Sequence, residues 1–484
     1  DGGHFWVDTD GESNETLGTN DADDYFLFGR EKAFVDVMGH HGNDFQLTGA
    51  LWIELNRLTD ELVVRGEFVC IPGYEWSANT AVGGDRNVHY RREGETIHRS
   101  SHAQIADPTD MVDEESDAHT AHELFEKLKG KDCVVLAHIG GRYADITFAH
   151  DEALEAAVEV HSAWGTFEWV VRDAFEKNFR VGIVANSDGH KGRPGACYPG
   201  ASFFGSMGGL TCFLSPRLDR DAIFECMRRR HHYATTGNLM LLDVSAGFAS
   251  DAELFHRNPD IGPCTSETVR RVIMGDIARV ADDEVELDIE VAGSAPIERL
   301  DIFDGLDLIE TIRPYGETDL GSRLRMIYEG AEYRGRSRTT VWDGDLTVTG
   351  NGIVTASMLN NWNLDRGIRE QAAGRLAWKA VTTGNFGGLG LAMQDRTAGR
   401  IAVRTPHVEA EIPISDFGLE DMIFKAGGLD RSLKFYRLPD RLSETRIAHR
   451  MSVAVAAGRD TRLFVRVTQE DGHRAWSSPI YLFR

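Results

Sequence analysis

Acidic residues and histidines follow six apolar, strand-like runs in the first half of the chain. The clearest case is "VGIVANSDGHKGRPG" (residues 181–195), in which the apolar run gives way to Asp188 and His190. The other five runs are followed by Asp8, Asp10 and Glu12; by His40 and His41; by Glu75; by His138; and by Glu159 and His161. Burying so many ionisable groups without compensation is unfavourable. Neutral imidazole and carboxylate are the usual ligands of divalent metals, so these residues predict a metal site.

Spacing divides the candidates into ligands and supporting groups. Residues two apart on a strand point the same way, so one ion could bind Asp188 with His190, or Asp10 with Glu12. Asp8 could instead orient a metal ligand by a hydrogen bond, without binding the metal itself. We expect only one of Glu159 and His161 to reach the metals, and we take His161. His41 could contact a substrate or be an ordinary polar neighbour.

These residues need a scaffold that brings strand ends together. Residues 1 to about 240 alternate short β-branched runs with helical stretches in about seven repeats, which is typical of a parallel α/β sheet or barrel. In such folds, ligands bind at the carboxyl ends of the strands. Asp219 or Asp221 is suited to cap the last helix of this half.

The second half has a different pattern. After about residue 240, runs such as "EVELDIEVAG" and "TRLFVRVTQ" show period-two alternation, separated by Gly, Asp and Asn turns. This pattern indicates antiparallel β structure, and we expect a sandwich. A chain of 484 residues is also too long for one core. We therefore predict two domains, residues 1–240 and 241–484.

Composition narrows the function classes. The formal net charge is −25, from 77 acidic and 52 basic residues, which argues against binding to nucleic acid. No apolar run approaches the roughly 18 residues of a membrane span. The six cysteines include no CxxC pair, so we expect reduced thiols and a cytoplasmic protein.

Several motifs together resemble the PHP (polymerase and histidinol phosphatase) superfamily, and most closely its branch of long proteins with a C-terminal β domain. The motifs are "GHHGNDFQLT", "PGYEWSANT", "GGDRNVHY", "IHRSSHA", "AHIGGRYAD", "VEVHSAWGTFEW", "NSDGHKGRPGA" and "VRVTQEDGHRAWSSPIYL". The resemblance implies a distorted (β/α)7 barrel followed by a mostly antiparallel, sandwich-like domain. It also implies a site of two or three metal ions and hydrolysis, often of phosphoesters. The ligands implied at matching positions are His40, Glu75 as the bridging carboxylate, His138, His161, Asp188 and His190.

The first motif departs from that family. The superfamily's first strand normally ends in His-x-His, whereas "VDTDGES" places Asp10 and Glu12 there. Carboxylates are harder ligands than imidazole and shift the preference from zinc toward manganese or iron. The expected cofactors are therefore two divalent ions of manganese, iron or zinc. A third ion lacks one of its usual histidines.

These features predict a metal-dependent hydrolase that uses a metal-activated water, with a phosphoester as the favoured substrate. Asp188 or a nearby histidine would accept the proton, and His41, Arg142, Lys191 and Arg193 are further candidates for the catalytic machinery. Arginine offers a planar fork suited to phosphate or carboxylate.

Two alternatives remain open. Trp76, Trp164 and Trp169 lie near the expected site and would suit a hydrolase of carboxyl esters, carbamates or amides with a small aromatic substrate. The altered first motif would suit a non-catalytic metal-binding or scaffolding protein. The expected partner is a small anionic molecule, and the sequence does not indicate an oligomeric state.

Overall fold

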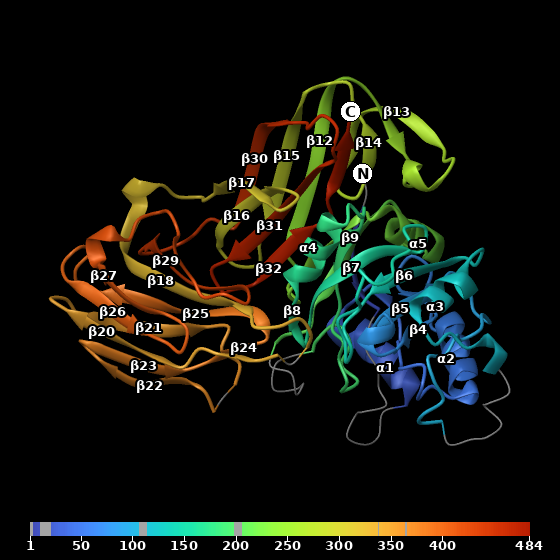
Figure 1. Cartoon of the computed structure of the whole chain (residues 1–484), viewed down its shortest axis with the longest axis horizontal. Helices are drawn as coiled ribbons and strands as arrows, with labels where there is room; N and C mark the ends of the chain where they lie inside the picture. Colours follow the sequence, from blue (N-terminus) through green and yellow to red (C-terminus); the bar gives the residue numbers. More distant parts are fainter. Residues whose placement is uncertain (1–2, 10–20, 106–113, 198–205, 337, 364) are drawn as a thin grey trace.

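The computed structural model describes residues 3–9, 21–105, 114–197, 206–336, 338–363 and 365–484 (Figure 1). It is a mixed α/β fold with few helices and many strands, which confirms the mixture predicted from the sequence. Among the described residues, the first half holds five α-helices, fewer than the roughly seven repeats expected.

The N-terminal region, residues 3–240, contains all five α-helices described. They are α1 (Ala22–Phe28), α2 (Gly49–Glu61), α3 (Ala121–Leu128), α4 (Glu168–Glu176) and α5 (Arg220–Arg229). Its strands are β1 (Gly3–Asp8), β2 (Val37–Met38), β3 (Val69–Cys70), β4 (Gly73–Trp76), β5 (Arg86–Tyr90), β6 (Cys133–Ala137), β7 (Glu155–Ser162), β8 (Gly165–Thr166), β9 (Gly182–Ala185), β10 (Leu210–Ser215) and β11 (His232–Thr235).

The strands of this region pair in two sheets. One runs β3-β2-β1-β10-β11, and the other runs β4-β5-β6-β7-β8 with β9 also paired to β7. Strands β1, β2 and β3 are parallel, as are β6, β7 and β9, whereas β4–β5, β5–β6, β1–β10 and β10–β11 are antiparallel. The hydrogen-bonded pairs described therefore form mixed sheets rather than one closed ring of parallel strands.

The first and the last strands of the C-terminal half, here called the inner β unit, continue the first of these sheets. Its strands are β12 (Leu241–Phe255), β13 (Ser266–Ile273), β14 (Ile277–Arg279), β15 (Glu284–Ala292), β16 (Ile297–Asp304), β17 (Asp307–Ile312), β30 (Arg446–Ala454), β31 (Thr461–Gln469), β32 (Arg474–Ser477) and β33 (Ile480–Phe483). Strand β11 pairs antiparallel with β32, which joins the N-terminal region to this unit within one sheet.

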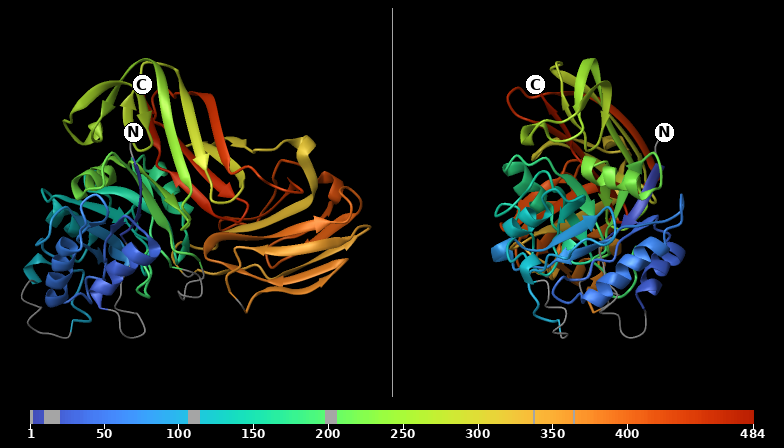
Figure 2. Two further views of the ribbon diagram at one scale, coloured as in Figure 1. Left: turned by 180° about the vertical axis from the view of Figure 1, so that it is seen from behind. Right: turned by 90° about the vertical axis from the view of Figure 1, so that its right-hand side faces the viewer.

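The remaining strands form an outer β unit between β17 and β30. They are β18 (Leu320–Ala331), β19 (Thr340–Val341), β20 (Gly344–Thr349), β21 (Ile353–Leu359), β22 (Gly367–Ala372), β23 (Arg375–Lys379), β24 (Val381–Thr382), β25 (Gly384–Met393), β26 (Arg400–Arg404), β27 (Glu409–Pro413), β28 (Met422–Lys425) and β29 (Leu429–Pro439). Two five-stranded antiparallel sheets of this unit share one apolar core, which includes Met326, Trp342, Leu376 and Leu389. The unit projects to one side of the molecule (Figure 2).

Local features agree with the sequence in several places. Asp219 caps α5, because its side chain accepts a hydrogen bond from the backbone N–H of Ala222 at 2.8 Å. All six cysteines are free thiols, and five of them are buried. Within the described residues, no helix is both long enough and apolar enough to cross a membrane.

Candidate active site

A cavity of about 250 Å³ is lined by three of the predicted metal ligands. It is lined by Asn43, Phe45, Gln46, Glu75, Gln104, Gly141, Arg142, Trp164, Asp188, His190 and Arg336. All but Arg336 belong to the N-terminal region. The cavity therefore brings together Glu75, Asp188 and His190 of the predicted ligands, with Arg142 beside them.

Glu75 enters the cavity from β4, within the strand rather than beyond its end. Its carboxylate accepts a hydrogen bond from the Ser77 hydroxyl at 2.6 Å and one from the Asn43 amide at 3.3 Å. Asn43 also forms a parallel bridge with Glu75. The side chain is thus fixed from two directions while it lines the cavity.

His138 directly follows β6 and is fully buried. Its Nδ1 donates to the Glu159 carboxylate at 2.9 Å, which places Nε2 on the opposite side of the ring. That Nε2 lies 3.4 Å from an Asp188 oxygen and 3.9 Å from a Glu75 oxygen. A carboxylate behind Nδ1 is the usual support of a metal-binding histidine, because it fixes the tautomer and the ring orientation.

Asp188 and His190 both line the cavity because the chain turns after the end of β9. Strand β9 ends at Ala185, so the period-two argument from the sequence does not account for their alignment. Asp188 has a φ of 44°, in the left-handed region, which few residues other than glycine, Asn and Asp adopt readily. His190 Nδ1 donates to the Asp188 carbonyl at 3.0 Å, and its ring meets Trp164 edge-on.

Arg142 is held at the cavity by Asp85, which the sequence reasoning missed. The Arg142 Nε donates to Asp85 at 2.9 Å, and the Arg142 backbone N–H donates to the same carboxylate at 2.7 Å. The guanidinium also lies 3.9 Å from Glu75. Burial and the nearby Glu75 raise the pKa of Asp85, and Arg142 opposes that rise. The motif "GGDRNVHY" contained Asp85, but nothing in its spacing marked it.

His40 and His41 do not line this cavity. His40 is buried, with its ring edge-on to Tyr25 at 5.0 Å between centroids. Burial lowers the pKa of His40 to about 4, so its imidazole is neutral near pH 7, as a metal ligand requires. His41 is also buried and packs against His89 with 4.3 Å between ring centroids.

His161 lies in a different place from the one expected. Its Nε2 donates to the Met207 carbonyl at 2.9 Å, and its Nδ1 accepts from the Thr166 hydroxyl at 2.8 Å. It lines a separate, small cavity together with His473 and Arg474. Both ring nitrogens are therefore occupied by protein atoms, and it is Glu159 that reaches His138.

The remaining candidates fall outside the cavity or outside the described residues. Lys191 is half-buried and Arg193 is exposed, and neither lines the cavity. Asp10 and Glu12 lie outside the described residues. Asp8 accepts hydrogen bonds from the backbone N–H groups of Ser187 at 3.1 Å and Gly195 at 2.7 Å, so it fixes both ends of the loop that carries Asp188.

The donor set around the cavity fits a divalent metal ion. Among the described residues, no three His, Cys, Asp or Glu side chains are gathered closely enough to form a ready-made metal group. However, the Asp188 Oδ2 is buried and has no hydrogen-bond partner among the described residues. Burial of such an oxygen is unfavourable unless another group, such as a metal ion, binds it. Glu75, Asp188 and His190 line the cavity, and His138 Nε2 lies 3.4 Å from Asp188. Carboxylate and imidazole are the ligand types that manganese, iron and zinc use.

Arg336 was not predicted from the sequence as a site residue. It comes from the loop between β18 and β19 in the outer β unit, and its guanidinium carbon lies 3.4 Å from the Trp164 ring centroid. Only the cluster of arginines in "EYRGRSR" could have drawn attention to this loop. The site therefore includes a residue from the second half of the chain.

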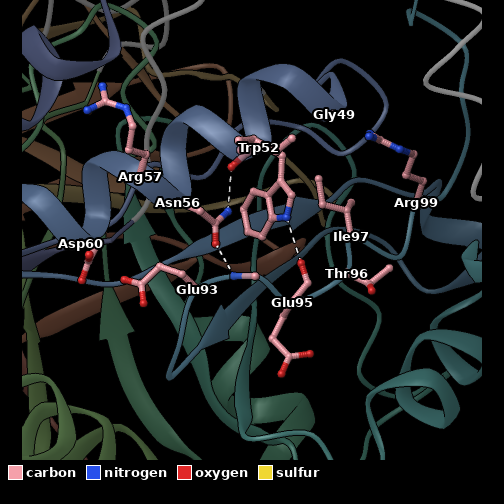
Figure 3. A pocket seen from close by; sticks show the side chains of 12 residues that line it. Gly49, Trp52, Asn56, Arg57, Asp60, Glu93, Glu95, Thr96, Ile97 and Arg99 are labelled. Carbon is pink, nitrogen blue, oxygen red and sulfur yellow. Dashed lines mark hydrogen bonds between the residues drawn. The ribbon is translucent and has the colours of Figure 1, made fainter.

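A larger cavity, of about 720 Å³, lies elsewhere, between α2 and residues 93–99 (Figure 3). Its polar groups largely bond to one another: Trp52 Nε1 donates to the Glu95 carbonyl at 2.9 Å, and Asn56 donates to the Trp52 carbonyl at 2.7 Å. Among the residues that the structure describes, no histidine or cysteine lines it. Size alone favours this cavity, but the chemistry favours the smaller one.

Comparisons with known proteins add little to this picture. No family model matches the chain, and no curated protein matches its sequence. Among solved structures, the chain is similar to a two-domain protein from Bacteroides vulgatus that contains a predicted PHP-like metal-dependent phosphoesterase. The two share 12% identity with a TM-score of 0.34, over 60% of this chain and 91% of that one. The function is therefore inferred from the residues of the site.

Proposed function

We propose that this protein is a metal-dependent hydrolase that acts on a phosphoester. The observation that carries the proposal is the convergence of Glu75, His138 and Asp188, with His190 and Arg142, around one cavity of about 250 Å³. Glu75, His138, Asp188 and His190 would hold a divalent metal. When bound, such an ion supplies Lewis acidity and an activated water at neutral pH.

The residues of the chain would then orient and stabilise the reactants. Glu159 and Asn43 hold His138 and Glu75 in place through hydrogen bonds of 2.9 Å and 3.3 Å. Arg142, which remains positively charged, would face the negative charge that develops on the phosphoryl oxygens. Asp188, with one buried oxygen that lacks a hydrogen bond among the described residues, would accept the proton of the attacking water.

A phosphoester is favoured over a carboxyl ester because two arginines, Arg142 and Arg336, line the cavity. Guanidinium groups stabilise a multiply charged phosphoryl group better than they stabilise a neutral ester or amide. Of the tryptophans that suggested an aromatic substrate, Trp164 lines the cavity, but Arg336 covers its ring. Trp76 is fully buried.

The test combines metal analysis with activity. The purified protein is assayed for bound metals, reloaded with manganese, iron or zinc, and tested on 4-nitrophenyl phosphate and 4-nitrophenyl acetate. We expect bound divalent metal and faster turnover of the phosphate ester. Turnover of the acetate alone would support the ester hydrolase instead, and absence of both metal and turnover would support a non-catalytic protein.

The matched variants are His138→Ala and His122→Ala. We expect His138→Ala to abolish turnover and lower the bound metal while the circular dichroism spectrum is unchanged. His122 is an exposed histidine that contacts Phe148, so its substitution should leave activity and metal content as in the wild type. Equal activity in the two variants would refute this site.

A further inference from the structure

The outer β unit contributes one residue to the candidate active site. The loop between β18 and β19 carries Arg336 across to the cavity that Glu75, Asp188 and His190 line. The Arg336 guanidinium lies close to two parts of the N-terminal region, Trp164 and Gly141. The guanidinium carbon lies 3.4 Å from the Trp164 ring centroid, and a Cβ at position 141 would lie 3.0 Å from Arg336 Nη2. The position of this guanidinium is thus defined by the N-terminal region.

Within the part of the chain that the structure describes, no residue pairs with the polar groups of Arg336. Among the described residues, it makes no ion pair and no hydrogen bond, although it is half-buried. The other arginine of the cavity differs, because Arg142 is paired with Asp85 at 2.9 Å. Arg334, in the same loop as Arg336, is paired with Asp173 at 2.6 Å. Arg336 therefore brings unsatisfied N–H donors to a cavity that already holds candidate metal ligands.

Stacking on an aromatic ring leaves the edge of a guanidinium available. The guanidinium carbon of Arg336 lies 3.4 Å from the Trp164 ring centroid, and a guanidinium that stacks on a ring keeps its N–H groups free for an anion at the edge. Burial lowers the pKa of Arg336 and disfavours its charge, and Asp188 and Asp85 oppose that shift from a distance. A bound anion would compensate the charge directly.

We propose that Arg336 binds the phosphoryl group of the substrate, so that the active site is completed by the outer β unit. This rests on the proposed function and specifies its substrate class as a phosphate ester with accessible non-bridging oxygens. Arg336 would donate hydrogen bonds from its N–H groups to those oxygens, in the cavity that Glu75 and Asp188 also line. Its contribution is to bind and orient, so it should act on substrate affinity more than on the chemical step.

The test measures anion binding separately from turnover. Calorimetry follows the binding of inorganic phosphate and of benzoate to the manganese-loaded protein, and kinetics follow 4-nitrophenyl phosphate. The variants are Arg336→Gln, Arg336→Lys and, as the matched control, Arg338→Gln, which removes an exposed arginine of the same loop. Thermal unfolding establishes that each variant is folded.

We expect Arg336→Gln to weaken phosphate binding about tenfold or more and to raise KM about as much, with kcat changed less than about threefold. Arg336→Lys should recover only part of the affinity, because lysine lacks the planar fork. Arg338→Gln should match the wild type. Equal phosphate affinity in Arg336→Gln and Arg338→Gln, no phosphate binding by the wild type, or a preference for benzoate would each overturn the assignment.

The two proposals can fail separately. Phosphate binding that depends on Arg336 without turnover of any ester would contradict the proposed hydrolase and support the role of Arg336. Turnover of 4-nitrophenyl phosphate that is identical in Arg336→Gln and the wild type would contradict the role of Arg336 alone.

Discussion

His138 is the residue whose surroundings most resemble those of a metal ligand. One ring nitrogen is held by Glu159, and the other lies within 3.9 Å of both Glu75 and Asp188. Glu159 is 1% exposed and also accepts from the Asn186 amide at 2.9 Å, so it is held in place from behind. Its role would be to position His138 rather than to contact a reactant.

This role predicts the effect of Glu159→Gln. Glutamine keeps the size and a hydrogen-bond acceptor but loses the charge that raises the basicity of the imidazole. Outer carboxylates of this kind typically contribute roughly 10- to 100-fold to metal affinity. We expect manganese or zinc titrations to show a loss of that order, with unfolding unchanged, whereas His138→Ala should lose the metal more completely. Wild-type metal affinity in Glu159→Gln would contradict the positioning role.

A second residue, His232 on β11, predicts how stability depends on pH. Burial lowers its pKa to about 3, against about 6.5 in an unfolded chain. Its Nδ1 lies 3.1 Å from the Ile183 carbonyl, and Nε2 has no hydrogen-bond partner among the described residues. Between these two pKa values, the unfolded state binds the additional proton. The stability that depends on neutral His232 is therefore complete above about pH 6.5 and decreases as the pH falls toward 3.

His232→Gln should reduce that dependence by one proton, or about 1.4 kcal/mol per pH unit over this window. Glutamine is chosen because it can still donate to the Ile183 carbonyl. Urea unfolding of the wild type and the variant at several pH values between about 7.5 and about 4.5 measures the pH dependence of the unfolding free energy. We expect the two curves of unfolding free energy to converge as the pH falls. Parallel curves would show that His232 does not titrate in this way.

At the scale of single elements, the sequence predicted the types of strands and helices better than the directions of their side chains. Runs that end near His138 and Asp188 are the strands β6 and β9. Strand β7 could not be interpreted from its alternation, because its pairing with β9 shifts by one residue between Glu159 and His161. A bulge of this kind redirects the side chains that follow it, and no period-two pattern reveals it. The sequence therefore favoured His161, whereas Glu159 reaches the site.

Two further features of the site depend on tertiary contacts that sequence patterns do not contain. Asp188 and His190 converge through a turn with a left-handed residue, which Asp8 holds from β1. Arg336 arrives from a loop about 150 residues later in the chain. Residue type indicated which side chains near strand ends could bind a metal. It did not indicate which of them come together, because contacts between distant segments depend on tertiary packing.

Strand β7 also contains a buried ion pair that fastens it to β5. The Arg86 Nε donates to Glu155 at 2.9 Å, and both side chains are fully buried. The other guanidinium nitrogens donate to backbone carbonyls, including that of Ala149 at 2.8 Å. Arg86, which lies near the predicted ligands in the sequence, is thus structural.

Glu155→Gln should be strongly destabilising, by about 3–5 kcal/mol, because it leaves the buried Arg86 charge without its counterion. Glu54→Gln is the matched control, since Glu54 pairs with Arg57 on the exposed face of α2, where solvent screens the pair and little stability is lost. Chemical unfolding of both variants measures the difference. Similar losses in the two variants would contradict the importance assigned to this pair.

At the scale of the whole molecule, the boundary near residue 240 is crossed by a continuous sheet. Tyr233 pairs with Ser477, and Ala234 with Trp476, where β11 meets β32. The Tyr481 hydroxyl donates to the Val181 carbonyl at 2.7 Å, next to β9. The last strands of the chain thus support the strand that precedes Asp188.

This continuity predicts that residues 1–240 do not form a stable fold alone. Phe464, Trp476 and Tyr481 from the inner β unit belong to one apolar core with Val160, Val181 and other residues of the N-terminal region. Burial of each large side chain contributes roughly 1.5–3 kcal/mol. Losing all of them removes about 5 kcal/mol or more, which is comparable to the whole stability of many proteins. The edge of β11 would also be left unpaired.

The measurement is amide hydrogen exchange of β9, β10 and β11 in three samples: the full chain, a chain that ends at residue 240, and that shorter chain produced together with residues 241–484. We expect strong protection in the full chain, little in the isolated N-terminal half, and recovery when both halves are present. The metal content should follow the same order, because Asp188 and His190 directly follow β9. Full protection and metal binding in the isolated half would show that it is an independent domain.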